Sequence, residues 1–424
     1  MKKLTVIGAG TAGLVSALLL RRDGYQIDVY EALPDARTQA RTGFVSGTVT
    51  LSERGLITLD KLGIRNQVER IAMPLSGQQV HLLGVSESRL LPYSHLGEKL
   101  WCVSREALDL LLLNVASTVD GITICHDAEC TAIDLTTQTV YLTRSRGQEE
   151  TAALDWHYDS LIVADGARSR VRSLLAAKQE LTETFTPSEF RFLEFIIPDT
   201  ETTRSRFTPG YLQLWPRGNY FVIGFPLQDH SFVGAMFFKE APDRAPRRMV
   251  ESFCKDRFHA ELADLLEIMP DLWSRIENSM LRQLNMVTVD PWTAGANGVL
   301  VGDAAHVILP FLGQGMNAAL EDVDLLATLV SDHNHDWNKA TKKFSEIRQS
   351  DLAALTTLSR AHFERLASTV ADVSVDSVIA KEKQMSERYP ETFRSLYQLI
   401  EFTRTPLVDC ERLARELHEQ LQRG

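Results

Sequence analysis

The first 31 residues place a glycine-rich turn and one helix between two apolar strands, and this order restricts the fold more than any other stretch. Leu4 to Ile7 form an apolar run, GAGTAG follows at residues 8–13, and an apolar helical pattern continues to Arg22. A second apolar run, Gln26 to Tyr30, ends at Glu31. This succession predicts a βαβ unit of a doubly wound α/β sheet.

Three glycines and one acid of this unit have separate physical roles. Gly8 permits a tight turn, Gly10 lets the backbone approach a pyrophosphate, and Gly13 lets the helix pack closely on the strand. Glu31, at the end of the second strand, is placed to bind the ribose hydroxyls of an adenosine. We therefore expect this unit to bind a dinucleotide.

A second glycine-rich stretch, GVLVGDAAHVILPFLGQGMNAALED at residues 298–322, predicts another ligand-binding turn. Val299 to Val301 form a short strand, and Asp303 stands just beyond its carboxyl end, where open α/β sheets bind ligands. Gly313 and Gly315 precede a predicted helix. Glycines at the start of a helix let backbone N–H groups approach a ligand, and the helix dipole favours negative charge there.

Composition excludes several other classes of protein. The 424 residues carry a net charge of −11, which argues against nucleic acid or an anionic membrane surface as a partner. The five cysteines are scattered without metal-ligand spacing, so we expect reduced thiols and no metal site. No apolar run has the length of a membrane span, and the N-terminus lacks a small-residue cleavage site. We expect a cytoplasmic protein.

The remaining chain predicts an α/β fold with an inserted antiparallel sheet and a helical C-terminal region. Alternation between Phe185 and Phe238 indicates the inserted sheet. We expect a dinucleotide-binding Rossmann domain from residues 1–75, 98–180 and 285–335, a substrate-binding β-sheet domain from 76–97 and 181–284, and a helical region at 336–424. Further predictions are a strand at Val80 to Leu83, helices at Glu53 to Leu62, Arg105 to Ala116 (with Ser104 as its N-cap), Trp337 to Leu366 and Tyr397 to Leu421, and a helical stretch at Met249 to Glu277.

Four motifs in this order resemble those of a known family. They are GAGTAG with Glu31, SREALDLLL at 104–112, DGARSRVR at 165–172 and the stretch at 298–322. Together they resemble the single-component FAD-dependent aromatic hydroxylases of the para-hydroxybenzoate hydroxylase fold. LWPRG at 214–218 and LSERG at 51–55 are most similar to the kynurenine 3-monooxygenase family within that class.

The resemblance implies FAD as cofactor and NAD(P)H as co-substrate, without a second nucleotide domain. In this family reduced FAD adds O2, and a flavin hydroperoxide transfers oxygen to an electron-rich aromatic ring. The implied cofactor-binding residues are Gly8, Gly10, Gly13, Glu31, Arg41, Arg105, Asp165, Asp303, Gly315, Met316 and Asn317. Arg168 and Arg170, in the loop after Asp165, belong to a motif associated with both FAD and the reduced nicotinamide.

The implied catalytic segment beside the flavin is Pro310, Phe311, Leu312, Gly313 and Gln314. Its task is to hold the ring and to exclude water. We expect His306 to be structural rather than a base. N-hydroxylation, oxidative rearrangement, halogenation and flavin binding without turnover stay open as alternatives, although Trp292 lacks the paired tryptophan of halogenases.

The implied substrate-binding residues are Gln78, Tyr93 and Tyr397. Gln78 stands where the family has an arginine that binds the substrate carboxylate, and Ala361 stands where it has an asparagine. A neutral amide offers no charge-assisted bond, so we expect free L-kynurenine to be a poor substrate. Arg89, on the predicted strand before Tyr93, stays open as a replacement cation.

Overall fold

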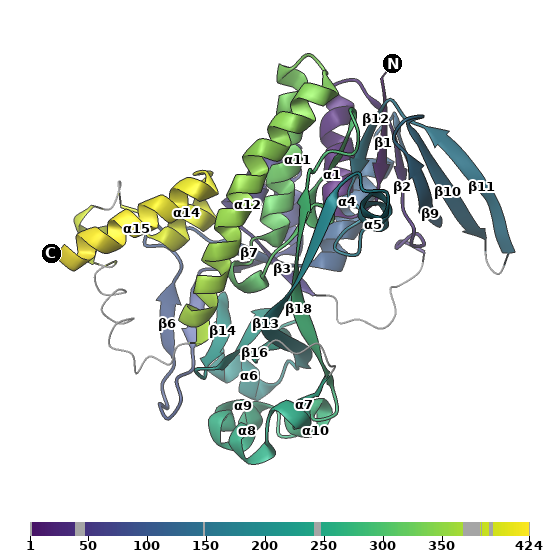
Figure 1. The fold of residues 1–424 in the computed structure, drawn as a ribbon. Helices are drawn as coiled ribbons and strands as arrows, with labels where there is room; N and C mark the ends of the chain where they lie inside the picture. The colour runs from purple at the N-terminus through teal and green to yellow at the C-terminus, as the bar shows by residue number, and fades with distance from the viewer. Residues whose placement is uncertain are drawn as a thin grey trace.

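The computed structural model describes residues 2–38, 47–146, 149–240, 247–367, 382, 384–389 and 393–423. Figure 1 shows a parallel sheet with helices at one end, long strands that lead to a second sheet, and C-terminal helices at the side. The predicted fold class is confirmed by this arrangement. Arg41 lies outside the described residues. No helix of the described ranges is both long and apolar enough to cross a bilayer.

In the described residues, the first sheet has five parallel strands in the order β19-β12-β1-β2-β8. Numbered along the chain and read from β8, this is the doubly wound order 3-2-1-4-5. The winding reverses between β1 and β12, and ligands bind at the carboxyl ends of strands at such a point. The strands are β1 Lys3–Ile7, β2 Gln26–Tyr30, β8 Ile122–Cys125, β12 Ser160–Val163 and β19 Gly298–Leu300.

The helices around this sheet pack closely at one glycine. A Cβ atom on Gly302 would lie 3.1 Å from the Cβ of Ala319 and 3.4 Å from that of Ala12. A side chain at this position would therefore push α1 and α11 away from the sheet. The helices of this part are α1 Thr11–Arg22, α2 Glu53–Lys61, α3 Arg65–Ile71, α4 Arg105–Ser117, α5 Arg170–Ala177, α11 Gly315–Asp332 and α12 Trp337–Ala367.

Two long antiparallel strands, β13 and β18, connect the first sheet with the second (Figure 1). The second sheet has the order β17-β18-β13-β16-β15-β14-β5-β6, and β20 pairs with β18. Its strands are β5 Gly77–Val80, β6 Arg89–Pro92, β13 Thr182–Ile197, β14 Tyr211–Pro216, β15 Tyr220–Pro226, β16 Phe232–Lys239, β17 Arg247–Arg248, β18 Met280–Asp290 and β20 His306–Val307. The domain boundary expected between residues 284 and 285 falls inside β18, so the division into domains stays a prediction.

Smaller elements complete the fold. They are β3 Thr48–Leu51, β4 Met73–Leu75 and β7 Leu100–Ser104, which pair as β3-β7-β4, and β9 Ala128–Asp134, β10 Thr139–Arg146 and β11 Glu149–His157, which pair as β11-β10-β9. The short helices are α6 Glu201–Arg206, α7 Met249–Ser252, α8 Lys255–Glu261, α9 Ala263–Ile268, α10 Leu272–Ile276, η1 Gly302–Ala304 and η2 Pro310–Leu312. Two helices near the C-terminus are α14 Leu396–Phe402 and α15 Leu407–Arg423.

Two sequence predictions about single elements were wrong. The strand expected at Val80 to Leu83 begins at Gly77 instead, because β5 takes its register from a parallel pairing with Tyr211 to Leu214. The helix expected from Tyr397 to Leu421 ends at Phe402 and starts again after Pro406, since proline has no N–H to continue it. The helical stretch expected at Met249 to Glu277 is confirmed and consists of four short helices.

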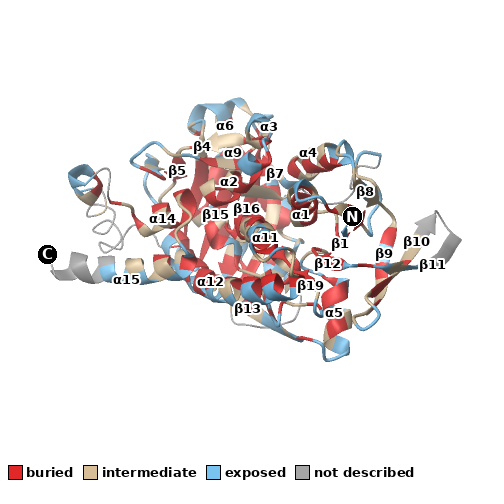
Figure 2. Cartoon of the chain, turned by 90° about the horizontal axis from the view of Figure 1, so that it is seen from above, coloured by how far each residue is buried: buried red, intermediate tan, exposed pale blue. Residues whose placement is uncertain are grey.

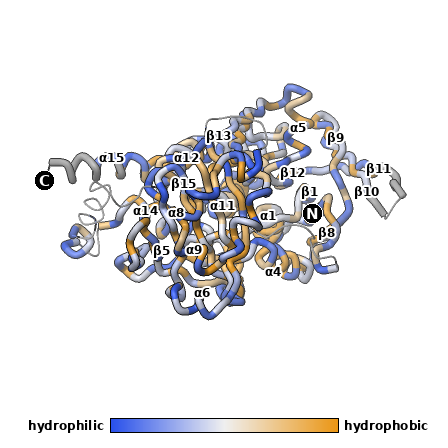
Figure 3. Tube along the Cα trace, turned by 90° about the horizontal axis from the view of Figure 1, so that it is seen from below, coloured by the Kyte–Doolittle hydropathy of each residue, from blue (hydrophilic) through white to orange (hydrophobic). Residues whose placement is uncertain are grey.

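Apolar side chains gather into three clusters. The first lies between the parallel sheet and its helices, and the second joins the outer face of the large sheet to α7–α10. The third lies between them and contains Tyr93, Phe190, Phe311 and Phe363. Figure 2 shows buried residues around α11, β15 and β16, and Figure 3 shows hydrophobic chain in the same central region.

A buried ionic network joins α11 to α12 and to the loop after β19. Asp322 Oδ2 accepts a hydrogen bond from the Gly302 backbone N–H at 3.0 Å and lies 2.7 Å from His306 Nε2. Its Oδ1 accepts a hydrogen bond from Arg348 Nε at 2.7 Å. Arg348 also pairs with Glu321 at 3.0 Å. Burial raises the pKa of Asp322, but the neighbouring His306 and Arg348 charges outweigh it, so that the pKa is lowered. His306 thus has the structural contact expected of it.

Replacement of Arg348 by methionine tests how much this network contributes to the free energy of unfolding. Arg348→Met leaves the Asp322 and Glu321 carboxylates buried without that cation, and we expect a loss of about 3–5 kcal/mol in the free energy of unfolding. Arg412→Met, which removes an exposed cation, is the control and should cost about 1 kcal/mol or less. Denaturant titration followed by circular dichroism measures both. Equal midpoints for the two variants would contradict the assigned role.

Candidate active site

The glycine-rich turn after β1 leaves one helix N-terminus open. A Cβ on Gly13 would lie 1.9 Å from the Gly8 carbonyl oxygen, so the turn and α1 touch backbone to backbone. A Cβ on Gly10 would meet no atom within 4 Å. Helix α1 has neither a side-chain cap nor an acid in its first turn. Its unpaired N–H groups and its dipole therefore suit a phosphate group.

Glu31 is fixed beside this turn. Its carboxylate accepts hydrogen bonds from the Ala9 backbone N–H at 2.7 Å and from the Leu33 backbone N–H at 3.0 Å. The side chain stands after β2, next in the sheet to β1. A carboxylate held in this way can accept hydrogen bonds from ribose hydroxyls on its remaining lone pairs.

Asp303 and the start of α11 form the second part of the same edge. Asp303 follows β19, is half-buried, and its carboxylate has no hydrogen bond within the part of the chain that the structure describes. Helix α11 has no side-chain cap and no acid in its first turn, and a Cβ on Gly315 would meet no atom within 4 Å. Met316 is half-buried on the first turn.

Asn317 shapes the turn before α11. Its amide nitrogen donates to the carbonyl oxygens of Thr50 at 2.9 Å and Gly313 at 3.1 Å, and its amide oxygen accepts from the Ser52 N–H at 2.9 Å. These three bonds use much of the hydrogen-bonding capacity of the side chain. Asn317 therefore holds the turn in place from within the protein.

The DGARSR turn after β12 is tied to the same edge by a residue that sequence analysis did not single out. Asp165 accepts a hydrogen bond from Val171 N–H at 3.1 Å, and burial raises the pKa of its carboxyl although these hydrogen bonds oppose it. Arg172 is buried and donates to the carbonyl oxygens of Asp303 and Ala304 at 3.2 and 3.1 Å. No local signal distinguished it from the exposed Arg168 and Arg170, because only tertiary contacts bury it.

These features fit a flavin dinucleotide. Two uncapped helix N-termini, a fixed carboxylate after β2 and an Asp303 carboxylate that has no hydrogen bond among the described residues line the carboxyl edge of one doubly wound sheet. They offer donors to phosphate and flavin oxygens and acceptors to ribose and ribityl hydroxyls. Arg105 is exposed at the start of α4, where Ser104 caps the helix as predicted, and its charge lowers the pKa of Glu194, which burial raises overall.

The predicted catalytic segment, Pro310 to Gln314, begins at an exposed residue and continues into the protein interior. Pro310 is exposed, whereas Phe311 and Leu312 are buried. The Phe311 ring packs against Phe190 at 4.8 Å and against Phe363 at 4.9 Å between centroids. Aromatic packing of this kind keeps water away from the segment.

Gln314 binds a buried acid that sequence analysis did not identify. Its amide nitrogen donates to Glu401 Oε2 at 2.7 Å and to Ser52 Oγ at 3.3 Å. Within the described residues, the second oxygen of Glu401 and the amide oxygen of Gln314 are buried without a partner. Such an oxygen costs about 1–3 kcal/mol unless a bound group supplies a donor. Glu401 follows Tyr397 by one helical turn, and that spacing was the missed signal.

A cavity of about 120 Å³ brings together the three predicted substrate-binding residues. Gln78 of β5 and Tyr93 after β6 come from the second sheet, and Tyr397 comes from α14. The Tyr93 and Tyr397 rings are stacked at 5.4 Å, and the Tyr397 ring is stacked on His362 at 5.7 Å. The Tyr93 hydroxyl and the Gln78 side chain form a hydrogen bond. The other lining residues are Val80, Leu91, Pro92, Leu214, Pro216, His362, Arg365, Leu366, Glu382 and Ser395.

Among the described residues, the charged groups that reach this cavity are Arg365 of α12 and Glu382, and none comes from β6. Arg89 is exposed on β6 and is not among the lining residues. Arg365 and Glu382 line the cavity, whereas Ala361 is exposed and does not. Burial lowers the pKa of His362 to about 3, so this ring is neutral.

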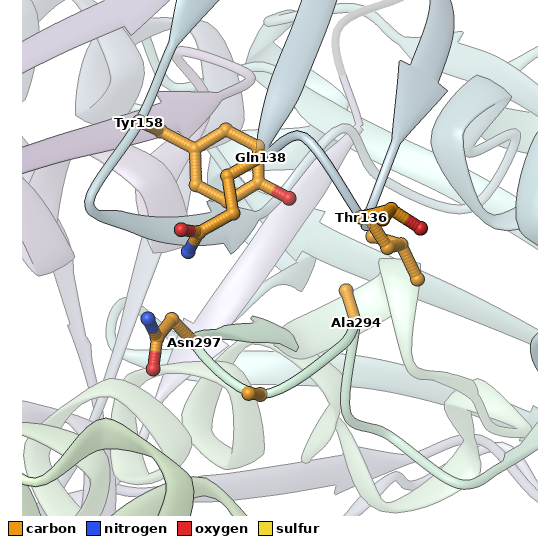
Figure 4. Close-up of a pocket in the computed structure, with 7 residues that line it drawn as sticks. Thr136, Gln138, Tyr158, Ala294 and Asn297 are labelled. Atoms are coloured by element: carbon orange, nitrogen blue, oxygen red, sulfur yellow. The ribbon is translucent and has the colours of Figure 1, made fainter.

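A separate hollow of about 240 Å³ lies at the other edge of the parallel sheet, lined by Thr136, Gln138, Tyr158, Ala294 and Asn297 among others (Figure 4). Tyr158 precedes β12 and Asn297 precedes β19. The hollow is thus at the amino ends of strands whose carboxyl ends carry Asp165 and Asp303. None of the predicted site residues lines it.

Comparison with known proteins supports this geometry. Residues 2–341 match the model of the FAD binding domain family. The chain belongs to this family. It is 31% identical over 431 residues to the kynurenine 3-monooxygenase of Xanthomonas axonopodis pv. citri, covering 100% of this chain and 93% of the relative. The kynurenine 3-monooxygenase of Legionella pneumophila is 29% identical, with coverages of 96% and 89%.

Solved structures show the same fold. The 2-methyl-3-hydroxypyridine-5-carboxylic acid oxygenase has a TM-score of 0.65 and 18% identity, covering 94% of this chain and 95% of its own. The tetracycline destructase Tet(51) has a TM-score of 0.63 and 19% identity, with coverages of 93% and 99%. The family and these relatives establish a flavoprotein monooxygenase with FAD as its cofactor.

Substitution of Gly10 separates cofactor binding from folding. Because no protein atom lies within 4 Å of the added methyl group, Gly10→Ala should leave the stability of the FAD-free protein unchanged. The methyl group would instead occupy the approach to the pyrophosphate, and we expect FAD affinity to fall at least about tenfold, or about 1.4 kcal/mol. Gly13→Ala should already impair folding, because its Cβ would lie 1.9 Å from a carbonyl oxygen. Flavin fluorescence titration and thermal melts measure both. Unchanged FAD affinity in Gly10→Ala would argue against this turn as the pyrophosphate site.

Proposed function

We propose that the protein hydroxylates an aromatic small molecule with O2 and with NAD(P)H as the electron donor. The observation that carries this proposal is the cavity at Gln78, Tyr93 and Tyr397, whose apolar wall belongs to the same cluster as Phe311. Bound and reduced FAD supplies the redox chemistry that activates O2. The kynurenine 3-monooxygenases among the relatives are named for an aromatic substrate, which supports this class of reaction.

The residues of this chain would supply binding, orientation and exclusion of water. Gly8, Gly10, Gly13 and Glu31 would hold the pyrophosphate and adenosine end of FAD. Asp303, Gly315, Met316 and Asn317 would hold the flavin end, with Arg105, Asp165 and the undescribed Arg41 as further contacts.

The segment Pro310 to Gln314 would separate the flavin from the substrate cavity. Tyr93 and Tyr397, whose rings are stacked on one another, line the cavity, and an aromatic substrate would pack beside them. Gln78, bonded to the Tyr93 hydroxyl, presents an amide to the cavity. Buried Phe311 and Leu312 exclude water that would divert the activated oxygen.

A panel of aromatic amines, ketones and acids tests the proposal with the FAD-loaded enzyme. We expect at least one member to stimulate NAD(P)H oxidation and to gain one oxygen atom, measured by mass spectrometry of the product. The position of the new hydroxyl group, determined by nuclear magnetic resonance, distinguishes ring hydroxylation from N-hydroxylation and from rearrangement. The proposed function would be contradicted if no member of the panel led the FAD-loaded protein to oxidise NAD(P)H.

Specificity for the substrate carboxylate is tested at Gln78. Because Gln78 carries no charge, we expect weak turnover of L-kynurenine by the wild type and a gain of about tenfold or more in kcat/KM with Gln78→Arg, from one charge-assisted bond. Arg89→Ala is the control and should change little, since Arg89 is exposed and outside the cavity. If the wild type turned over kynurenine efficiently and Arg365→Ala did not, the carboxylate-binding site would have to be assigned to α12.

A further inference from the structure

Helix α14 connects the catalytic segment with the substrate cavity through one buried acid. Tyr397 and Glu401 are four residues apart on this helix and therefore share a face. Tyr397 lines the cavity, whereas Glu401 accepts a hydrogen bond of 2.7 Å from the Gln314 amide nitrogen. Both Glu401 and Gln314 are buried, with exposures of 0% and 1%. The wall of the cavity and the catalytic segment are thus joined by a single short helix.

We propose that Glu401 is a positioning residue of the active site, which holds the Gln314 amide so that its carbonyl oxygen accepts a hydrogen bond from the bound substrate. This inference rests on the function proposed above. The Gln314 amide nitrogen donates to Glu401 Oε2 at 2.7 Å and to Ser52 Oγ at 3.3 Å, and these two bonds hold the amide group. Its carbonyl oxygen is buried and lacks a partner within the described residues.

Glu401, which binds the Gln314 amide, also lies close to the tyrosines of the substrate cavity. Burial raises the pKa of both Tyr93 and Tyr397, and the Glu401 carboxylate raises both further. Glu401 is thus within electrostatic reach of the two rings that form the cavity wall. A substrate with an N–H or O–H group on its ring, such as an aromatic amine, would supply the donor that Gln314 lacks.

Among the residues that the structure describes, no cation binds Glu401 directly. Arg54 of α2 is the charged residue beside it, and its guanidinium donates instead to the Ile400 and Thr405 carbonyl oxygens and to Glu321. Tyr93 and Tyr397 are the titratable groups on the other side. An ionised Glu401 would therefore be a buried carboxylate with one neutral hydrogen-bond donor.

Burial raises the pKa of Glu401 to about 8, although the Gln314 hydrogen bond and the Arg54 charge oppose the rise. The carboxyl is therefore neutral at pH 7. Ionisation at higher pH would place an unpaired charge on the helix that carries Tyr397, and the structure relieves such a charge by admitting water or by moving the helix. Either response disturbs the cavity wall, so we expect substrate affinity to fall as Glu401 ionises.

The experiment compares FAD-loaded wild type, Glu401→Gln and Glu401→Leu, with Glu416→Gln as a control at an exposed acid of the C-terminal helix α15. The Kd of 2-aminoacetophenone, L-kynurenine and anthranilate is measured from the flavin absorption difference, from about pH 6 to about pH 9. We expect the wild-type Kd to rise above about pH 8, by up to about tenfold per pH unit. Glu416→Gln should follow the wild type, and Glu401→Gln should show no such rise.

Stability supplies a second measurement with a definite sign. The folded protein raises the pKa of Glu401 above its unfolded value, so the stabilising contribution is complete below the unfolded pKa and is lost as pH rises through about 8. The Tm of the wild type should therefore fall relative to that of Glu401→Gln between mildly acidic pH and pH 8. If Glu401 had only a structural role, Glu401→Gln would still change the pH dependence of Tm, but the pH dependence of Kd would be the same in the wild type and in Glu401→Gln.

Two results would overturn the inference while the proposed function stands. One is a pH dependence of Kd that is the same in the wild type and in Glu401→Gln. The other is a Kd that is unchanged in Glu401→Leu. Because leucine cannot hold the Gln314 amide, we expect Glu401→Leu to bind the amine-bearing ligands at least about tenfold more weakly at every pH, with unchanged FAD content. A wild type that binds no ligand of the panel would contradict the proposed function together with the inference.

Discussion

The buried carboxylate of Asp322 is the contact on which the cofactor edge depends. Taking a carboxylate out of water costs several kcal/mol, and only close cations and hydrogen bonds offset this cost. Here Gly302, His306 and Arg348 supply them from the loop after β19 and from α12. The loop that carries Asp303 is thereby fixed against α11 within the protein itself. Because this edge is preformed, binding of the cofactor does not have to order the loop, and the entropy cost of binding is smaller.

Local sequence signals were sufficient for the parts of the fold in which chemistry and backbone geometry coincide. Gly13 touches the Gly8 carbonyl, so the glycine spacing of GAGTAG reports a backbone contact that no other residue permits. The apolar strand before Asp303 is likewise buried, as its run of apolar residues indicates. By contrast, the start of β5 at Gly77 depends on a pairing with Tyr211 more than 130 residues away. No local pattern contains that information.

The candidate site shows the same division. Gln78, Tyr93 and Tyr397 were predicted from a resemblance, and the fold brings all three to one cavity. Glu401 and Arg172 were missed because an acid or a base in a helical segment is usually exposed, and only tertiary contacts bury these two. The order of motifs along the chain therefore predicts which segments meet, but not which charged side chains become internal partners.

The stacked pair of Tyr93 and Tyr397 gives the cavity two unequal walls. The wall from α14 also carries Glu401, whose bond to Gln314 reaches the catalytic segment. The second sheet contributes Gln78 and Leu91 to the cavity, and its Phe221 and Phe237 rings contact Phe311. Substitutions at Gln78 or Leu91 would change the shape and polarity of the cavity without removing the Glu401–Gln314 bond. An enzyme engineer would randomise the sheet positions and leave the helix as a fixed reference.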